Sequence, residues 1–174
     1  MKIFVTGGTG YIGSHTVVEL QQSGFEVVIV DNLCNSNIQV LDGIEKITGI
    51  RPEFEQFDLT DAEATRDFFA RHKDIRAVIH FAALKAVGES VEKPLEYYRN
   101  NLNSMMNVLA SMREFGVKNL VFSSSCTVYG QADVLPVTEQ TPRKQAESPY
   151  GNTKAMCEAV SYTHLRAHET DSYL

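Results

Sequence analysis

The stretch that decides the fold is Lys2-Ile3-Phe4-Val5-Thr6-Gly7-Gly8-Thr9-Gly10-Tyr11-Ile12-Gly13, an apolar run that ends in a glycine-rich turn. The turn has G-x-G-x-x-G spacing at Gly8, Gly10 and Gly13, and a second triplet begins at Gly7. Glycine adopts backbone angles that a Cβ forbids, and it lets a pyrophosphate approach the backbone closely. A helix that begins at Tyr11 would point its N–H groups at those phosphates. This strand–turn–helix context predicts a dinucleotide site rather than a plain glycine-rich turn.

Further apolar runs alternate with helical patterns along the chain. The expected strands are Lys2–Thr6, Glu26–Val30, Glu53–Phe57, Ala77–Phe81 and Asn119–Ser123. The second, fourth and fifth are almost continuously apolar, which is typical of parallel strands buried on both faces. Strands that alternate with helices indicate βαβ units. We therefore expect an α/β fold with a Rossmann-like, doubly wound parallel sheet of strand order 3-2-1-4-5.

The expected helices carry start and stop signals. One covers Tyr11–Ser23 before Gly24, and another begins at Thr60, which has capping-box spacing to Glu63. The longest covers Leu95–Phe115 and presents one apolar stripe to the sheet, formed by Leu95, Tyr98, Leu102, Met105, Leu109 and Met112. Leu135–Pro149 contains three prolines and is expected to be a loop.

Asp31 ends the second expected strand, 21 residues after Gly10. This is close to the offset of about 20 residues at which a carboxylate binds the adenosine ribose. Its charge would repel a 2′-phosphate, and no Lys or Arg follows before Lys46. The pattern favours NAD over NADP, although an aspartate that caps a loop turn is an alternative interpretation.

A serine, a tyrosine and a lysine form the candidate catalytic group. The fifth expected strand ends in Ser123-Ser124-Ser125, and ligands of open α/β sheets bind beyond the carboxyl ends of strands. Tyr150 and Lys154 are four residues apart, so they share a face if this stretch is helical, as Pro149 suggests. A lysine ammonium near a phenol favours the phenolate, which can act as a general base on a sugar hydroxyl. Alone, the Tyr-x-x-x-Lys spacing is also common on ordinary surface helices.

Length and composition set limits on function. The chain has 174 residues, enough for about one domain. Its net charge of −6 argues against a nucleic-acid partner. No apolar run is long enough to span a membrane, and the N-terminus does not resemble a signal peptide. Three widely spaced cysteines suit reduced thiols in the cytoplasm, and neither a disulfide framework nor a metal site is expected.

Four more stretches extend the pattern: Asp31–Ser36, His80–Ser90, Pro94–Tyr98 and Ser123–Gly130. With the glycine turn and the Tyr-Lys pair, residues 1–160 resemble the extended short-chain dehydrogenase/reductase family, and within it the nucleotide-sugar epimerases. The resemblance implies tightly bound NAD, a UDP-hexose substrate and a homodimer for the full-length protein. It also implies that residues 1–160 form an incomplete NAD-binding domain, and that the carboxyl-terminal substrate domain is missing.

The resemblance assigns roles to individual positions. The residues implied to bind the cofactor are Gly7, Gly10, Tyr11, Ile12, Gly13, Asp31, Asn32, Asn35, Ser36, Asp58, Leu59, Phe81, Ala82, Ala83, Lys85, Asn100, Ser123, Tyr150 and Lys154. The implied catalytic set is Ser125, Tyr150 and Lys154. Cys126 departs from the family, which usually has alanine there.

The reaction that the resemblance favours is epimerisation at C4 by transient oxidation of the sugar. Dehydratases of the family carry an Asp-Glu pair directly after the serine or threonine, where this chain has Cys126 and Thr127. Decarboxylating relatives and epimerases of other sugars stay open, as does a non-catalytic NAD-binding module. The latter would have no use for Tyr150 and Lys154.

Other residues have simpler interpretations. His80 is expected to be a hydrogen-bonded core histidine, and Cys34 and Cys157 are expected to be inert thiols. Residues 161–174 depart from the family pattern and are similar to translated sequencing-adapter sequence. A divergent helix end is the alternative, and we expect frayed or extended structure there.

Overall fold

The computed structural model describes residues 1–170, with side chains described through residue 164. The chain divides into two compact units. The first consists of Met1–Ala82 and Ala110–Ser123, and the second of Ala83–Leu109 and Ser124–Leu174.

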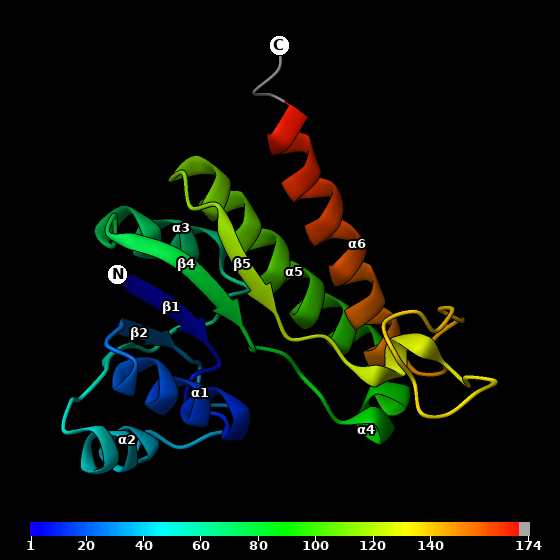
Figure 1. Ribbon diagram of the computed structural model, residues 1–174, viewed down its shortest axis with the longest axis horizontal. Helices are drawn as coiled ribbons and strands as arrows, with labels where there is room; N and C mark the ends of the chain where they lie inside the picture. Colours follow the sequence, from blue (N-terminus) through cyan, green and yellow to red (C-terminus); the bar gives the residue numbers. More distant parts are fainter. Residues whose placement is uncertain (171–174) are drawn as a thin grey trace. The chain divides into compact units, whose positions relative to one another are not determined.

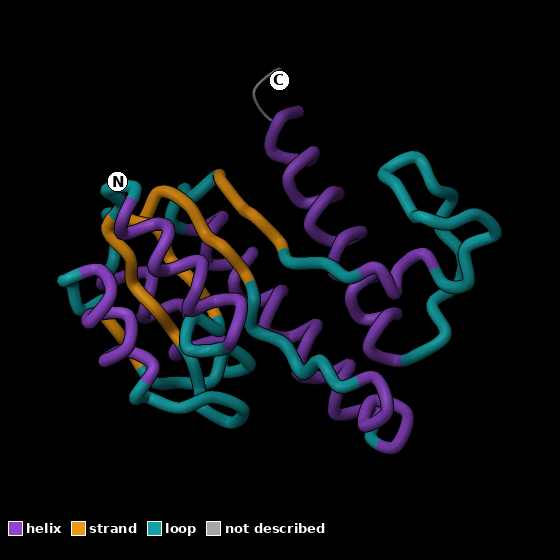
Figure 2. Tube along the Cα trace, turned by 60° about the horizontal axis from the view of Figure 1, so that its bottom comes forward, coloured by secondary structure: helices purple, strands orange, loops and turns teal. Residues whose placement is uncertain are grey.

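The first unit is built on a five-stranded parallel sheet (Figures 1 and 2). Its strands are β1 (Lys2–Thr6), β2 (Glu26–Val30), β3 (Glu53–Glu55), β4 (Ile75–His80) and β5 (Asn119–Phe122). They are arranged in the order β3-β2-β1-β4-β5, with every neighbouring pair parallel. Both the predicted fold class and the predicted strand order are confirmed.

Helices cover both faces of this sheet. On one face, α1 (Tyr11–Gln22) and α2 (Val40–Thr48) close a core with β1 and β2 (Figure 1). That core consists of Ile3, Val5, Val17, Val27, Ile29, Leu41 and Ile44. On the other face, α3 (Ala62–Arg71) packs its Phe68 and Phe69 rings 4.6 and 5.6 Å from the Phe4 ring of β1. Successive β1 residues thus point into different cores, as strand geometry requires.

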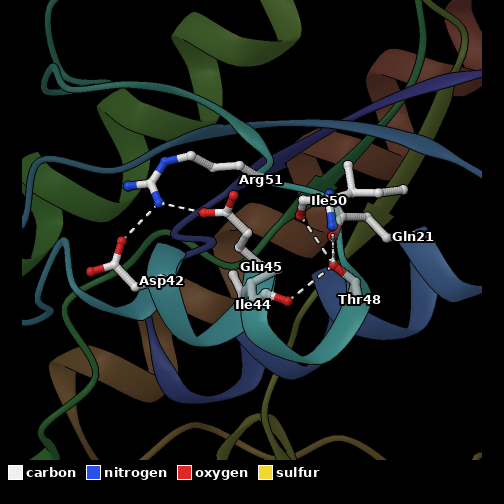
Figure 3. Close-up of polar contacts among 7 residues, drawn as sticks. All are labelled: Gln21, Asp42, Ile44, Glu45, Thr48, Ile50 and Arg51. Carbon is white, nitrogen blue, oxygen red and sulfur yellow. Dashed lines mark hydrogen bonds and ion pairs between the residues drawn. The ribbon is translucent and has the colours of Figure 1, made fainter.

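No helix was predicted at α2, although this helix contributes Leu41 and Ile44 to the core. Figure 3 shows how polar contacts hold its end: the Thr48 hydroxyl donates to Gln21 Oε1 of α1 at 2.9 Å. Arg51 Nη1 contacts carboxylates of Asp42 and Glu45 at 2.7 and 2.8 Å. The helix ends at Gly49, whose φ of +77° terminates the last turn.

Several local predictions for the first unit were wrong, among them the bounds of β4, which was expected at Ala77–Phe81 and covers Ile75–His80. The N-cap of α3 is Asp61, whose carboxylate accepts from Ala64 N at 3.0 Å, while the Thr60 hydroxyl donates to Asp58 instead. A carboxylate is the stronger acceptor, so the cap lies one residue later. β3 ends at Glu55 rather than Phe57. β5 is the edge strand of the described sheet and is not buried on both faces, since Val121 is 60% exposed.

The second unit contains α4 (Val87–Glu92), most of α5 (Pro94–Glu114), a short 3-10 turn η1 (Cys126–Tyr129) and α6 (Pro149–Thr170). The predicted apolar stripe of the long helix holds at Met105 and Leu109, but Leu95 is 69% exposed and Tyr97 is buried instead. Pro149 is the first residue of α6, as predicted.

The helix α6 corrects the expectation of frayed structure after residue 160. It continues to Thr170, because residues 152–170 contain neither proline nor glycine to end it. Residues 171–174 lie outside the described part of the chain. Between residues 1 and 170, no helix is long and apolar enough to cross a membrane.

Candidate functional site

The glycine turn connects β1 to α1 and leaves no space for a side chain at Gly7 or Gly13. Gly7 has φ +66°, and a Cβ there would lie 2.9 Å from Ala82 N. A Cβ on Gly13 would lie 2.3 Å from Gly7 O, so the first turn of α1 rests directly on the end of β1. Only glycine fits either position without a backbone shift, which is the physical basis of the motif.

The beginning of α1 is suited to an anion. Its N-cap, Gly10, offers no side-chain cap, and its first turn carries no acidic residue. The amino-terminal N–H groups and the positive end of the helix dipole therefore face outward uncompensated. Tyr11 and Ile12, at the start of this helix, are 77% and 60% exposed. Large exposed apolar side chains beside free backbone donors are typical of a ligand site.

Asp31 lies directly after β2 and is held against the glycine turn. Its Oδ1 accepts from Leu33 N at 2.9 Å and from the Ser36 hydroxyl at 3.1 Å. Its Oδ2 accepts a longer bond from Thr9 N, 3.3 Å. The Thr9 and Ser36 hydroxyls are 2.8 Å apart, which ties the turn to the loop after β2.

Asn32 and Asp58 form a second polar pair beside this loop. Asn32 Nδ2 donates to Asp58 Oδ2 at 3.0 Å, and the backbone and hydroxyl of Thr60 donate to Oδ1. Burial alone would raise the pKa of Asp58, but these hydrogen bonds outweigh it and the pKa lies below its ordinary value. Leu59 is buried next to it, whereas Asn35 is exposed.

The carboxyl end of β4 places three more predicted residues. Phe81 N donates to Thr6 O at 3.2 Å, and Ala82 N donates to the Thr6 hydroxyl at 3.1 Å. His80 is 1% exposed and its Nδ1 lies 2.9 Å from the same hydroxyl, which confirms the expected core histidine. Ser123 N donates to His80 O, so Ser123 also lies beside the carboxyl end of β4.

In the second unit, the loop that carries Ala83 and Lys85 is fixed by α5. Asn101 clamps the backbone of Leu84 from both sides, with Oδ1 2.8 Å from Leu84 N and Nδ2 3.0 Å from Leu84 O. The buried Tyr97 hydroxyl accepts from Ala86 N at 3.1 Å and donates to Glu89 at 2.8 Å. Lys85, on the same loop, is exposed. Asn100 donates to Asn101 Oδ1 at 2.9 Å.

Ser125 is linked to the start of α6 through one threonine. The Thr127 hydroxyl donates to Ser125 Oγ at 2.9 Å, and Thr127 N approaches the same oxygen at 3.3 Å. A Cβ on Gly151 would lie 3.0 Å from the Thr127 hydroxyl, so the two segments are in close contact. Gly151 directly follows Tyr150, and the structure therefore brings Ser125 near the start of the helix that carries Tyr150.

Tyr150 and Lys154 lie one turn apart on α6, as predicted. The ammonium of Lys154 is 6.0 Å from the centroid of the Tyr150 ring. Lys154 is only 4% exposed, and this burial lowers the pKa of its amine to about 8. Burial likewise raises the pKa of the neighbouring Cys157 thiol to about 11, in keeping with an unreactive cysteine.

The predicted residues thus fall into two internally connected groups. In the first unit, the turn lies against Asp31, Ser36 and Ala82. In the second, hydrogen bonds run from Asn100 through Asn101 to Thr153 on α6, whose hydroxyl donates to Tyr150 O at 2.7 Å.

Sequence reasoning missed several supporting residues: Thr9, Tyr97, Asn101, Thr127 and Thr153. The one sequence feature that could have identified them is a short polar or phenolic side chain one to four residues from a motif position. Within residues 1–170, no cluster of three or more His, Cys, Asp or Glu side chains could hold a metal ion.

Comparison with solved structures extends the similarity over nearly all of the chain. UDP-glucose 4-epimerase from Bifidobacterium longum, solved in complex with NAD+ and UDP, is 43% identical with a TM-score of 0.91, covering 98% of this chain and 50% of that one. The enzyme from Stenotrophomonas maltophila, with bound NAD and formylated UDP-arabinopyranose, is 48% identical with a TM-score of 0.89, covering 94% of this chain and 48% of that one.

Curated relatives agree with the structural neighbours. UDP-glucose 4-epimerase of Bacillus subtilis is 52% identical over 160 residues, which are 92% of this chain and 47% of that protein. The Schizosaccharomyces pombe enzyme uge1 is 50% identical over 162 residues, 91% of this chain and 45% of that protein. The chain spans about half the length of the curated relatives it matches. The model of the NAD dependent epimerase/dehydratase family matches residues 3–172, and the chain belongs to that family.

Proposed function

We propose that this chain is the amino-terminal, NAD-binding part of a UDP-glucose 4-epimerase, which interconverts UDP-glucose and UDP-galactose. The observation that carries the proposal is the presence of Ser125, Tyr150 and Lys154 as one connected group in a chain that also has the dinucleotide turn. The named relatives of known reaction support the choice of substrate.

The residues of the first unit fit NAD. The glycine turn is a cradle that a Cβ at Gly7 or Gly13 would fill, and the uncapped start of α1 suits a pyrophosphate. Asp31 Oδ2 accepts a single long bond, and a carboxylate oxygen can accept two, so it can still receive a ribose hydroxyl. Tyr11 and Ile12, the remaining residues of the turn and Asn32, Asn35, Ser36, Asp58 and Leu59 would line the adenosine side.

The second unit supplies the groups that move a proton. Bound NAD supplies reversible hydride transfer at C4 of the sugar. Tyr150 removes the proton of the 4-hydroxyl and later returns it, and Ser125 orients that hydroxyl by hydrogen bonding. The Lys154 amine, with a pKa of about 8, is mainly protonated at pH 7 and places its positive charge 6.0 Å from the centroid of the Tyr150 ring. Lys85 and Asn100 would contact the cofactor beside this group.

The family also contains dehydratases, which need a second acid and base to expel water. Here those positions are Cys126, which is exposed, and Thr127, whose hydroxyl donates to Ser125. Neither residue has a carboxylate. This composition favours epimerisation over dehydration.

Two further proposals concern the complete protein. We propose that it is a homodimer, because α5 and α6 form an open apolar pocket lined by Leu102, Met105, Met106, Met156, Cys157, Ala159 and Val160, in which Met106 is 46% exposed. Met106→Glu should shift its sedimentation to that of a monomer, and an unchanged dimer would contradict this assignment. We also propose a reducing, cytoplasmic location, since Cys34 and Cys126 are exposed thiols and none of the three cysteines is paired.

The decisive experiment compares wild type with Tyr150→Phe in the complete protein. Wild type should retain NAD on purification and interconvert the two UDP-hexoses. Loss of the general base should slow turnover by about 10²–10⁴-fold. NAD retention should be unchanged, because the turn and Asp31 are intact. Wild-type-like turnover by the variant would remove Tyr150 from its proposed role, and absence of NAD from wild type would contradict the proposed function itself.

A further inference from the structure

We infer that Thr9 determines selectivity for NAD over NADP by holding the Asp31 carboxylate in place through Ser36. Thr9 lies within the glycine turn but is not one of the motif glycines. The inference rests on the proposed function, since it assumes that this turn binds NAD. It concerns residues of the first unit only.

The hydrogen bonds run in one direction. Ionised Asp31 can only accept, so the Ser36 hydroxyl must donate its proton to Asp31 Oδ1, 3.1 Å away. The Ser36 oxygen then accepts from the Thr9 hydroxyl, which lies 2.8 Å away. Thr9 is 2% exposed, so water does not readily replace its hydroxyl. Through this relay, the buried threonine sets the position of Ser36, and Ser36 sets that of the carboxylate.

The backbone of Thr9 acts on the other carboxylate oxygen. Thr9 N approaches Asp31 Oδ2 at 3.3 Å, a long bond. Together with Leu33 N at 2.9 Å from Oδ1, these contacts fix the plane of the carboxylate and leave Oδ2 able to accept further bonds. A carboxylate held in advance loses less conformational entropy when a ribose hydroxyl binds.

The relay affects the two dinucleotides differently. NAD presents ribose hydroxyls that the fixed carboxylate can accept, whereas the 2′-phosphate of NADP cannot donate in that way and is repelled by its charge. Loss of the relay should therefore weaken NAD binding and leave the already poor NADP binding almost unchanged. A purely structural role for Thr9 would weaken both alike, and this difference makes the NAD/NADP ratio the informative measurement.

The experiment titrates the complete, cofactor-stripped protein with NAD and NADP by calorimetry. Thr9→Val keeps the shape of the side chain and removes the hydroxyl, and it should raise the NAD dissociation constant about tenfold, as loss of about 1.4 kcal/mol predicts. Thr9→Ser restores the hydroxyl and should restore the affinity. Ser36→Ala breaks the same relay at its centre and should give a similar loss that is not additive with Thr9→Val.

The matched control is Ser14→Ala. The Ser14 hydroxyl donates to Tyr11 O within α1, at 3.1 Å, and does not touch Asp31. It should leave the NAD/NADP ratio unchanged. An unchanged ratio in both Thr9→Val and Ser36→Ala, or equal weakening of NAD and NADP, would overturn the inference while wild-type NAD binding upholds the proposed function. A wild type that shows no preference for NAD would overturn both.

Discussion

Because its amine is buried, Lys154 is expected to destabilise the folded protein when it is charged, although it is proposed to act in catalysis. Lys154 is 4% exposed, and desolvation lowers its pKa from 10.5 to about 8. At 1.36 kcal/mol per pKa unit, this difference corresponds to about 3 kcal/mol of unfavourable free energy when the amine is charged. Loss of its contact with the Tyr150 ring offsets about 1 kcal/mol. Lys154→Met should therefore raise the free energy of unfolding at pH 7 by about 2 kcal/mol.

The sign of the pH dependence follows from linkage. Below about pH 8 the amine is protonated in both the folded and the unfolded chain, so the penalty is fully present. Between about pH 8 and 10.5 the unfolded state binds more protons, and the stability of the wild type rises with pH. The advantage of Lys154→Met should shrink across this window and disappear above it.

The assay is denaturant unfolding of both proteins, followed by circular dichroism at pH 7, 9 and 10.5. Other groups that titrate in this range are shared by the two proteins and cancel in the difference. Lys118→Met, at an exposed position, is the matched control and should change stability little at any pH. Destabilisation by Lys154→Met at pH 7, or a difference between the two proteins that does not vary with pH, would refute the reasoning.

Two further substitutions test the framework of the site. Gly13→Ala places a Cβ 2.3 Å from Gly7 O and should destabilise the protein by about 1–3 kcal/mol in thermal unfolding. The control is Gly43→Ala, whose Cβ would have no atom within 4 Å and which should be neutral or stabilising. Equal effects of the two substitutions would contradict the close packing of the turn. Tyr97→Phe removes the hydroxyl that bonds Ala86 N and Glu89, and it should lower the free energy of unfolding by about 1 kcal/mol. In a double-mutant cycle with Glu89→Gln, the two substitutions should be coupled. Additive effects would argue against the contact.

Elements that carry local signals could be predicted from the sequence. β1 and β2 were predicted with their observed bounds, because their apolar runs end in a glycine turn and in Asp31. α6 was predicted to start at Pro149, whose fixed φ suits a first helical turn. The strand order followed from βαβ connectivity, which leaves few arrangements of a parallel sheet.

Other elements depended on tertiary contacts that no local pattern reveals. α2 is short, and its amphipathic face becomes meaningful only when Leu41 and Ile44 meet the core of β1 and β2. β5 has the composition of a buried strand, yet Val121 is exposed because burial is decided by what covers the strand rather than by its own residues. The cap of α3 moved by one residue because Thr60 is engaged by Asp58.

The candidate site divides in the same way, for a physical reason. Glycines, acids and the Tyr-Lys pair are recognisable because the chemistry restricts their residue type and spacing. The side chains that hold them are not restricted in this way: Thr9 acts through Ser36, 27 residues away, and Asn101 through Thr153, 52 residues away. Any short hydroxyl or amide could occupy such positions, and only the folded chain shows which ones meet. Each group is fixed by contacts within its own unit: the group proposed to bind phosphate and ribose by Thr9, Ser36 and Asp31, and the group proposed to transfer a proton by Asn101, Thr127 and Thr153. The two proposed roles therefore have separate supports, and the motifs alone do not reveal which residues provide them.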